Sequence, residues 1–175
     1  MKILVISGSP RKGGNTDIMV EAFVSGAKKN GNEVTVKNVG AMSINPCKDC
    51  EYCFGHDGEC IQKDDMTEVI EAVDKAEMLV LATPIYWFGM SSQIKLPIDR
   101  LYARAMKGFN IKCAALLADS MSEGVFSGPI AEYKGICAYL KWEDKGIITI
   151  SGMDTKGSMK TSPKLAEVTA LGESL

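Results

Sequence analysis

One segment constrains the fold of this chain most: an apolar strand that leads through a glycine- and hydroxyl-rich turn into an amphipathic helix. The strand is Ile3-Leu4-Val5-Ile6, and the turn covers residues 7–16, Ser-Gly-Ser-Pro-Arg-Lys-Gly-Gly-Asn-Thr. Glycine lets backbone approach an anion closely, and the start of a helix offers unpaired N–H groups and the positive end of its dipole. We therefore predict a phosphate site. Four side chains can add hydrogen bonds to it: Ser9, Arg11, Asn15 and Thr16.

The turn lacks the fingerprints of two common nucleotide sites. Gly14 is followed by Asn15 rather than by the Lys of a P-loop, and no Gly-x-Gly-x-x-Gly of a dinucleotide site follows the strand. A hydroxyl-rich loop without the metal-binding parts of a nucleotide hydrolase suits the monophosphate of a bound cofactor. The alternative is an ordinary strand–helix turn without a ligand.

Composition limits the class of protein. With 175 residues the chain can form one compact domain over residues 1–175. Its 20 Lys and Arg residues nearly balance its 22 Asp and Glu residues, so we expect neither nucleic acid nor an acidic membrane as a partner. No apolar run reaches the ~20 residues of a membrane span, and the start of the chain does not resemble a signal peptide. The sequence therefore predicts a cytoplasmic protein.

Apolar segments alternate with helical ones along the chain. Strands are predicted at residues 3–7, 33–38, 78–83, 112–118 and 146–151. The third and fourth are continuously apolar, as in parallel strands covered on both faces, whereas residues 34–37 alternate and indicate an edge strand. This pattern predicts an α/β fold: a doubly wound, five-stranded parallel sheet of order 2-1-3-4-5 with helices on both faces.

Helical periodicity predicts the segments between the strands. Helices are expected from about residue 15, from Met66, over 92–107, from Pro129 and near Ser162. Asp65 with Glu68 resembles a capping box at the start of the second helix. One long loop, with a cysteine-rich part at about residues 45–61, interrupts this plan, and loops of that length are usually functional.

In a sheet of this order, a ligand binds at the carboxyl ends of strands 1, 3 and 4. Residues 83–90, Thr-Pro-Ile-Tyr-Trp-Phe-Gly-Met, follow the third strand, and their three successive aromatic side chains need a planar or apolar partner. An aromatic cofactor ring is one such partner; the core or a subunit interface is another. Polar residues 119–124 follow the fourth strand and can close the pocket, although Asp119 could equally cap a helix or turn.

Four of the six cysteines crowd into 14 residues: Cys47, Cys50, Cys53 and Cys60. In a cytoplasmic chain this clustering does not indicate disulfides. The first three cysteines are three residues apart, a spacing that lets their thiols point to one place. Gly55 and Gly58 give the chain the flexibility to turn back and bring Cys60 to the same place. Such a set suits a [4Fe–4S] cluster or zinc, although zinc ribbons normally use a longer spacer; free or redox-active thiols are the third possibility. His56 is expected to be solvent-exposed, and Cys113 and Cys137 to be small core residues.

Three motifs together resemble the flavodoxin-fold NADPH-dependent FMN reductases, and most closely the iron–sulfur flavoprotein branch of that superfamily. They are residues 8–16, residues 84–89 and the Lys-Leu-Pro-Ile-Asp-Arg of residues 95–100, and the resemblance spans roughly residues 1–160. It implies a flavodoxin-like fold in which Ser9, Arg11, Asn15 and Thr16 hold the phosphate of FMN. The residues expected to line or close the isoalloxazine site are Pro84, Ile85, Tyr86, Trp87, Phe88, Gly89 and Asp119. Asp99 and Arg100 resemble a structural ion pair or a dimer contact, with plain solvated charges as the alternative.

The resemblance also implies a function. By this resemblance, the protein would be an FMN-dependent oxidoreductase that passes electrons between FMN and a [4Fe–4S] cluster held by the four clustered cysteines. No residue would need to act as a catalytic nucleophile or general base. Donors would be reduced ferredoxin or NAD(P)H, acceptors would be small oxidants, and the protein would be a homodimer or homotetramer. Two alternatives remain: an NAD(P)H-dependent FMN or quinone reductase without a cluster, and a non-enzymatic electron carrier.

Overall fold

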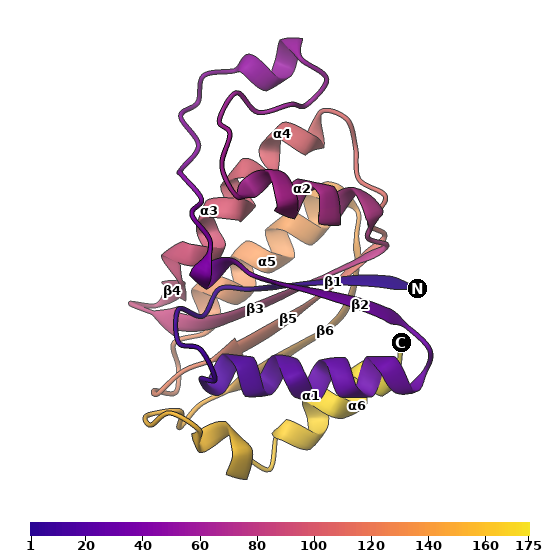
Figure 1. Cartoon of the computed structure of the whole chain (residues 1–175). Helices are drawn as coiled ribbons and strands as arrows, with labels where there is room; N and C mark the ends of the chain where they lie inside the picture. The colour runs from indigo at the N-terminus through magenta and orange to yellow at the C-terminus, as the bar shows by residue number, and fades with distance from the viewer.

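A parallel sheet lies between two helical layers in the computed structural model, which describes residues 1–175 (Figure 1). Five long strands are all parallel to their neighbours, in the order β2-β1-β3-β5-β6. They are β1 (Lys2–Ser7), β2 (Glu33–Asn38), β3 (Met78–Tyr86), β5 (Cys113–Asp119) and β6 (Glu143–Ile150). This order confirms the sequence-based prediction. A two-residue strand that was not predicted, β4 (Gly89–Met90), pairs antiparallel with β3.

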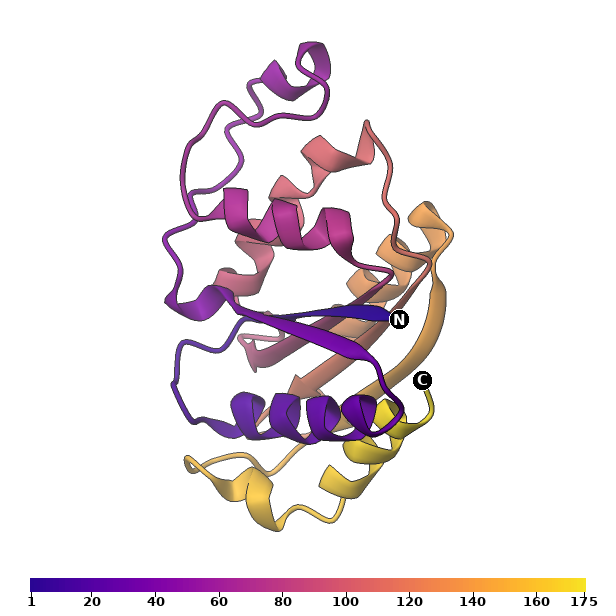
Figure 2. The ribbon, with the colours of Figure 1, turned by 45° about the vertical axis from the view of Figure 1, so that its right-hand side comes forward.

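Helices cover both faces of the sheet, as Figures 1 and 2 show. One face carries α1 (Asn15–Lys29) and α6 (Leu165–Glu173). The other carries α2 (Met66–Lys75), α3 (Ser92–Arg100), α4 (Tyr102–Ala105) and α5 (Ser127–Leu140). Three short 3-10 helices complete the secondary structure: η1 (Val39–Ala41), η2 (Tyr52–Gly55) and η3 (Ser158–Thr161). None of the helices has the length and apolar character needed to cross a membrane.

The continuously apolar strands supply the core on both sides of the sheet. Successive residues of a strand point to opposite faces. Leu79 and Leu116 accordingly pack beneath α2–α5, whereas Val80 and Leu117 pack against Phe23 of α1. Because both faces of β3 and β5 are buried, their carboxyl ends are held rigidly where the candidate site lies.

Two local predictions were wrong. The helix expected over residues 92–107 is divided at Leu101, whose N–H is shared between the carbonyls of Pro97 at 2.8 Å and Ile98 at 3.2 Å, a tightening of the backbone toward 3-10 geometry. The capping box is also absent. The carboxylate of Asp65 accepts from the backbone N–H of Ser43 at 2.6 Å, and Asp64 instead accepts from the N–H of Met66 at 3.2 Å.

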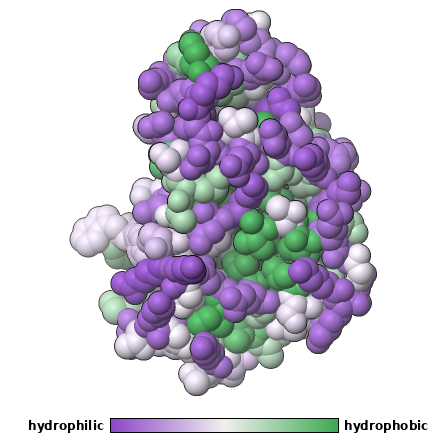
Figure 3. Space-filling view, in the orientation of Figure 1, coloured by the Kyte–Doolittle hydropathy of each residue, from purple (hydrophilic) through white to green (hydrophobic).

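Two segments extend from the body of the molecule. The long loop between η1 and α2 projects beyond the helical layer at the top of Figures 1 and 2, and its surface is mostly hydrophilic in Figure 3. We call residues 45–64 of this segment the cysteine loop. The β3–β4 hairpin protrudes at the left edge in Figures 1 and 3, at the carboxyl end of the sheet.

Candidate cofactor and metal sites

A cavity of about 500 Å³ opens at the carboxyl edge of the sheet. The turn after β1, the β3–β4 hairpin and the loop after β5 enclose it, as expected for this strand order. Every predicted flavin-site residue except Gly89 lines the cavity. The topology therefore brings together side chains that are separated by more than a hundred residues in the chain.

The turn after β1 leaves donors free at one end of the cavity. Gly8 is packed so tightly that a Cβ there would lie 2.5 Å from the Cβ of Ile94, which explains why glycine is needed. Ser9 is buried, Arg11 is exposed, and no carboxylate pairs with the Arg11 guanidinium. No hydrogen bond within the chain uses the backbone N–H groups of Asn15 and Thr16. These groups can receive an anion at the start of α1.

The side chain of Asn15 serves a neighbouring loop instead. Its Nδ2 donates to the carbonyls of Met153 at 3.3 Å and Thr155 at 2.8 Å. Its Oδ1 accepts from the backbone N–H groups of Gly157 at 2.9 Å and Met159 at 3.2 Å. Because a side-chain amide has two donor hydrogens and one acceptor oxygen, these bonds use its full capacity. The predicted phosphate contact of Asn15 is therefore left to its backbone N–H in this structure.

Thr16 and Asp119 form a buried pair at the floor of the cavity. The hydroxyl of Thr16 donates to Asp119 Oδ1 at 2.6 Å, and only 5% of Asp119 is exposed. Burial raises the pKa of the Asp119 carboxyl to about 6; the hydrogen bond from Thr16 opposes this rise and the nearby charge of Asp17 adds to it. Asp119 therefore lies at the cavity as a carboxyl that is partly protonated near neutral pH, and does not cap a helix.

The aromatic hairpin forms another wall of the cavity. Trp87 and Phe88 occupy the two central positions of the turn with φ values of 48° and 66°, the left-handed region used by tight hairpins. Tyr86 is 44% exposed, Trp87 94% and Phe88 64%, so these rings do not fill the core. At its base, Ser91 Oγ donates to the carbonyl of Gly8 at 2.8 Å, which ties the hairpin to the turn after β1.

Sequence reasoning missed one wall of this cavity. Met153 and Asp154 line it from the segment that follows β6, and Asn15 fastens that segment to the start of α1. The signal was available: these residues follow the fifth predicted strand, whose carboxyl end lies at the same edge of a parallel sheet.

Comparison with known proteins identifies the family of this chain. The model of the family "NADPH-dependent FMN reductase" matches residues 1–140. The chain belongs to this family. A stretch of 101 residues is 38% identical to an iron–sulfur flavoprotein of Archaeoglobus fulgidus and covers 58% of this chain and 46% of that protein. A second iron–sulfur flavoprotein of the same organism is 29% identical over 163 residues, which are 93% of this chain and 79% of that protein.

The chain spans about half the length of most of the curated relatives it matches. Among solved structures, an NAD(P)H:quinone oxidoreductase from Methanothermobacter marburgensis superposes with a TM-score of 0.75 at 18% identity, over 99% of this chain and 94% of that one. At this identity the likeness shows the fold, which is flavodoxin-like as predicted.

The cysteine loop of this FMN reductase family member carries its four thiols near the surface. Cys47 and Cys50 are exposed, and Cys53 and Cys60 are half-buried. The structure does not gather three or more Cys, His, Asp or Glu side chains into a group that could hold a metal ion. Burial, together with the neighbouring cysteine thiolates, raises the pKa of the Cys53 thiol. The assignment of these cysteines as metal ligands therefore stays a prediction.

The other cysteines and the histidine lie where the sequence predicted. Cys113 and Cys137 are buried in the core. His56 is exposed on the cysteine loop, where its ring stacks on Tyr52 with centroids 3.5 Å apart. Its Nδ1 lies 2.7 Å from the carbonyl oxygen of Tyr52. Neither observation gives His56 a place near the flavin-site cavity.

The sequence interpretation of Asp99 and Arg100 as one ion pair was wrong. Asp99 pairs with Lys95 on the same helix, whereas Arg100 is buried and pairs with Asp64 at the end of the cysteine loop. The two residues point to different neighbours because adjacent positions on a helix are about 100° apart around its axis.

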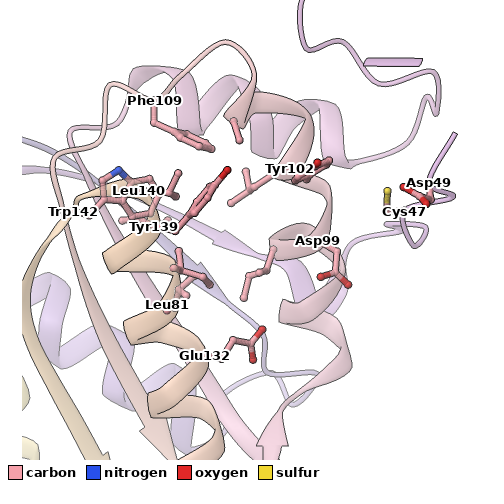
Figure 4. A pocket seen from close by; sticks show the side chains of 16 residues that line it. Cys47, Asp49, Leu81, Asp99, Tyr102, Phe109, Glu132, Tyr139, Leu140 and Trp142 are labelled. Atoms are coloured by element: carbon pink, nitrogen blue, oxygen red, sulfur yellow. The ribbon is translucent and has the colours of Figure 1, made fainter. Parts of the chain in front are cut away.

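An apolar groove of about 660 Å³ lies between α3–α4 and α5 (Figure 4). Figure 4 shows Phe109, Tyr139 and Trp142 on one side and Cys47 of the cysteine loop across from them. Tyr139 is 79% exposed and Tyr102 is 56% exposed. Large apolar side chains gathered in one groove are typical of a contact surface.

Proposed function

We propose that this protein is an FMN-dependent oxidoreductase whose FMN occupies the cavity at the carboxyl edge of the sheet. One observation carries the proposal: a single cavity is lined both by the turn that carries Arg11 and the free backbone donors and by an aromatic hairpin. This combination matches a phosphate monoester joined to a planar ring system. The family to which the chain belongs supports the same ligand.

The residues of the chain would divide the work of binding. Ser9 and Arg11 would hold the phosphate with their side chains, and Asn15 and Thr16 would hold it with the backbone N–H groups at the start of α1, because the Thr16 hydroxyl already donates to Asp119. Residues 84–88 would line the isoalloxazine, chiefly through backbone groups, while the aromatic side chains would exclude water from one side. When bound, FMN supplies reversible two-electron chemistry and can pass electrons on singly. No side chain needs to act as a nucleophile.

A comparison of FMN with riboflavin tests the phosphate end. In a fluorescence titration, we expect FMN to bind stoichiometrically with quenching of its fluorescence. Riboflavin, which lacks the phosphate, should bind far more weakly. Arg11→Ala should weaken FMN binding about tenfold, the loss of one charge-assisted hydrogen bond, and leave riboflavin unchanged. Lys12→Ala is the matched control, because Lys12 is exposed on the same turn but does not line the cavity. Equal affinities for FMN and riboflavin would contradict the proposed orientation.

The finer part of the proposal is a [4Fe–4S] cluster held by Cys47, Cys50, Cys53 and Cys60, which would exchange single electrons with FMN. Four thiols on one loop are the donor set that iron–sulfur clusters and zinc prefer. The similarity to iron–sulfur flavoproteins favours the cluster. Protein purified without oxygen should contain about four iron and four acid-labile sulfide per chain. Zinc, or thiols that titrate fully without metal, would contradict this part and leave the flavin proposal intact.

The same proposal includes the redox partners and the assembly: reduced ferredoxin or NAD(P)H as donor, a small oxidant as acceptor, and a homodimer or homotetramer. The apolar groove supports self-association, because a second copy seated on it would bury Tyr139 and lie beside Cys47. Tyr139→Asp should convert the oligomer to a monomer in light scattering after gel filtration. Ala166→Asp, an exposed position on α6 at the opposite face of the sheet, should not.

A second candidate is an NAD(P)H-dependent FMN or quinone reductase without a cluster. It is favoured because the four cysteines, although they line one small cavity, do not form a group that could hold a metal ion in this structure. This candidate predicts that NADPH bleaches the bound flavin under anaerobic conditions at the same rate in the wild-type protein and in a Cys50→Ser, Cys53→Ser double variant. A large loss of that rate in the double variant would exclude it.

A further inference from the structure

Arg100 joins α3 to both ends of the cysteine loop. Its side chain is 2% exposed. One terminal nitrogen, Nη1, forms an ion pair with Asp64 and donates to the carbonyl of Asn45 at 3.3 Å. The other, Nη2, donates to the sulfur of Cys60 at 3.4 Å and to the carbonyl of Gln62 at 3.5 Å. A single buried guanidinium thus contacts the residues where the loop leaves the protein body and where it returns.

Asp64 completes this junction. Its Oδ2 accepts from the backbone N–H of Asn45 at 2.9 Å and from the Asn45 side chain at 3.1 Å, in addition to Arg100. Gln62 Nε2 also donates to the carbonyl of Pro46 at 3.0 Å. We call the group formed by Asn45, Asp64 and Arg100 the clasp. It closes the cysteine loop at its base, so the loop is a constrained ring and not a free insertion.

The four cysteines are attached to the clasp unequally. Cys60 contacts Arg100 directly, whereas Cys47 and Cys50 are exposed on the part of the loop beyond the clasp. That part contains Asp49, Glu51 and Asp57 at φ values of 50°, 55° and 50°, a conformation that side chains other than glycine adopt at a cost. Cys60 is therefore the thiol whose position the protein body determines, and the other three lie on the part of the loop beyond the clasp, around the same small cavity as Cys60 and Arg100.

One donor of Arg100 remains unused. The Nε–H is buried and has no acceptor, although the four terminal N–H groups all have one. A buried donor without a partner destabilises the folded state. A hydrophobic side chain at this position would avoid that cost but would leave Asp64 buried without its cation, so the ion pair accounts for a cation here and the contact with the Cys60 sulfur is additional to it.

We propose that Arg100 is a positioning residue for the iron–sulfur centre: it fixes Cys60 as the anchored ligand and places a cationic hydrogen-bond donor on that ligand's sulfur. The inference rests on the cluster of the proposed function. A cluster bound by four thiolates becomes more negative when it gains one electron from the reductant. A cation and a hydrogen bond at a ligand sulfur stabilise the reduced form more than the oxidised form and so raise the reduction potential.

The test compares Arg100→Gln and Arg100→Lys with Arg104→Lys in the full chain with both cofactors. Arg104 is a matched control, because it is also buried and lies four residues further on, but its hydrogen bonds go to Asp74 of α2. The midpoint potential of the iron–sulfur centre, from a dye-mediated titration followed by electron paramagnetic resonance, should shift negative in Arg100→Gln. In Arg100→Lys, which keeps the positive charge but lacks the planar set of guanidinium N–H donors, the midpoint potential should shift less. The potential of Arg104→Lys should match that of the wild type.

A second readout needs no cofactor. A glutamate-specific protease can cut the exposed loop after Glu51 and Glu59. Cleavage of the metal-free chain should be several-fold faster in both Arg100 variants than in Arg104→Lys, because the clasp no longer restrains the loop. A merely structural arginine would change this rate but not the potential.

The outcomes separate the two proposals. A wild-type protein without iron contradicts the proposed cluster, and with it the role of Arg100. Iron retained in Arg100→Gln at the wild-type potential overturns the inference while the cluster stands. If Arg100→Gln does not fold, Arg100→Lys decides: an unchanged potential and iron content there also overturn the inference. Loss of iron from a folded, flavin-binding Arg100→Lys supports it.

Discussion

Replacing Asp119 with Asn should stabilise the FMN-free protein at neutral and alkaline pH. The pKa of this carboxyl is raised from 3.8 to about 6, because burial penalises its charged form more than the Thr16 hydroxyl stabilises it. A difference of this size corresponds to about 3 kcal/mol of folding free energy. Asn keeps an oxygen that can accept from Thr16 Oγ at the same place, so the substitution removes the charge with little change in packing.

The sign of the pH dependence follows from the raised pKa. Below pH 3.8 the carboxyl is protonated in both states and makes no difference to stability; between pH 3.8 and about 6 the unfolded protein releases this proton while the folded protein retains it, so stability falls over this range and the loss is complete above about pH 6. Urea unfolding at pH 4 and pH 8 measures this directly. We expect Asp119→Asn and the wild type to be similar at pH 4, and the variant to be up to about 3 kcal/mol more stable at pH 8.

Asp154→Asn serves as the control, because Asp154 lines the same cavity but is exposed. It should change stability little at either pH. If Asp119→Asn were no more stable than the wild type at pH 8, or gained as much at pH 4 as at pH 8, the assignment of a buried, destabilised carboxylate would be wrong.

Three further substitutions probe the packing and charge around the sites. Thr16→Val should cost about 1–3 kcal/mol in urea unfolding at pH 8, because it leaves a buried carboxylate without its donor. Gly8→Ala should cost about 1–3 kcal/mol and weaken FMN binding, since its Cβ would meet Ile94 at 2.5 Å and displace the turn after β1. Asp64 has a lowered pKa, because hydrogen bonds from Arg100 and the loop outweigh the effect of burial. Asp64→Asn should therefore be less stable than the wild type at pH 7, and the difference should disappear as the pH falls through that lowered pKa in thermal melts.

Much of the candidate flavin site was predictable, because the relevant signals are local. The strands were identified by continuously apolar segments and by one segment in which apolar and polar residues alternate. The order of the sheet followed from the alternation of strands with helices. The carboxyl-edge rule then selected Ser9, Thr16 and Asp119 from segments far apart in the chain, and all three line one cavity. Applying the same rule to the strand at the other edge of the sheet would also have found Met153 and Asp154.

The partners of individual polar side chains were not predictable in this way. Asn15 resembled a phosphate ligand, yet its amide binds a segment about 140 residues further along the chain. Arg100 was grouped with its neighbour Asp99, yet its partner is Asp64 on the cysteine loop. A side chain near the surface has several acceptors within reach, and which one it meets depends on how helices and loops pack, not on sequence spacing.

The sequence by itself therefore determined the architecture, the edge at which a cofactor can bind and the set of four thiols, because backbone preferences and burial patterns are encoded residue by residue. Only the tertiary structure decided that Asp119 is buried against Thr16, that the aromatic hairpin stands free and that Arg100 closes the base of the cysteine loop. Each of these depends on contacts between distant segments, whose desolvation and hydrogen bonding exist only after the sheet and its helices have packed.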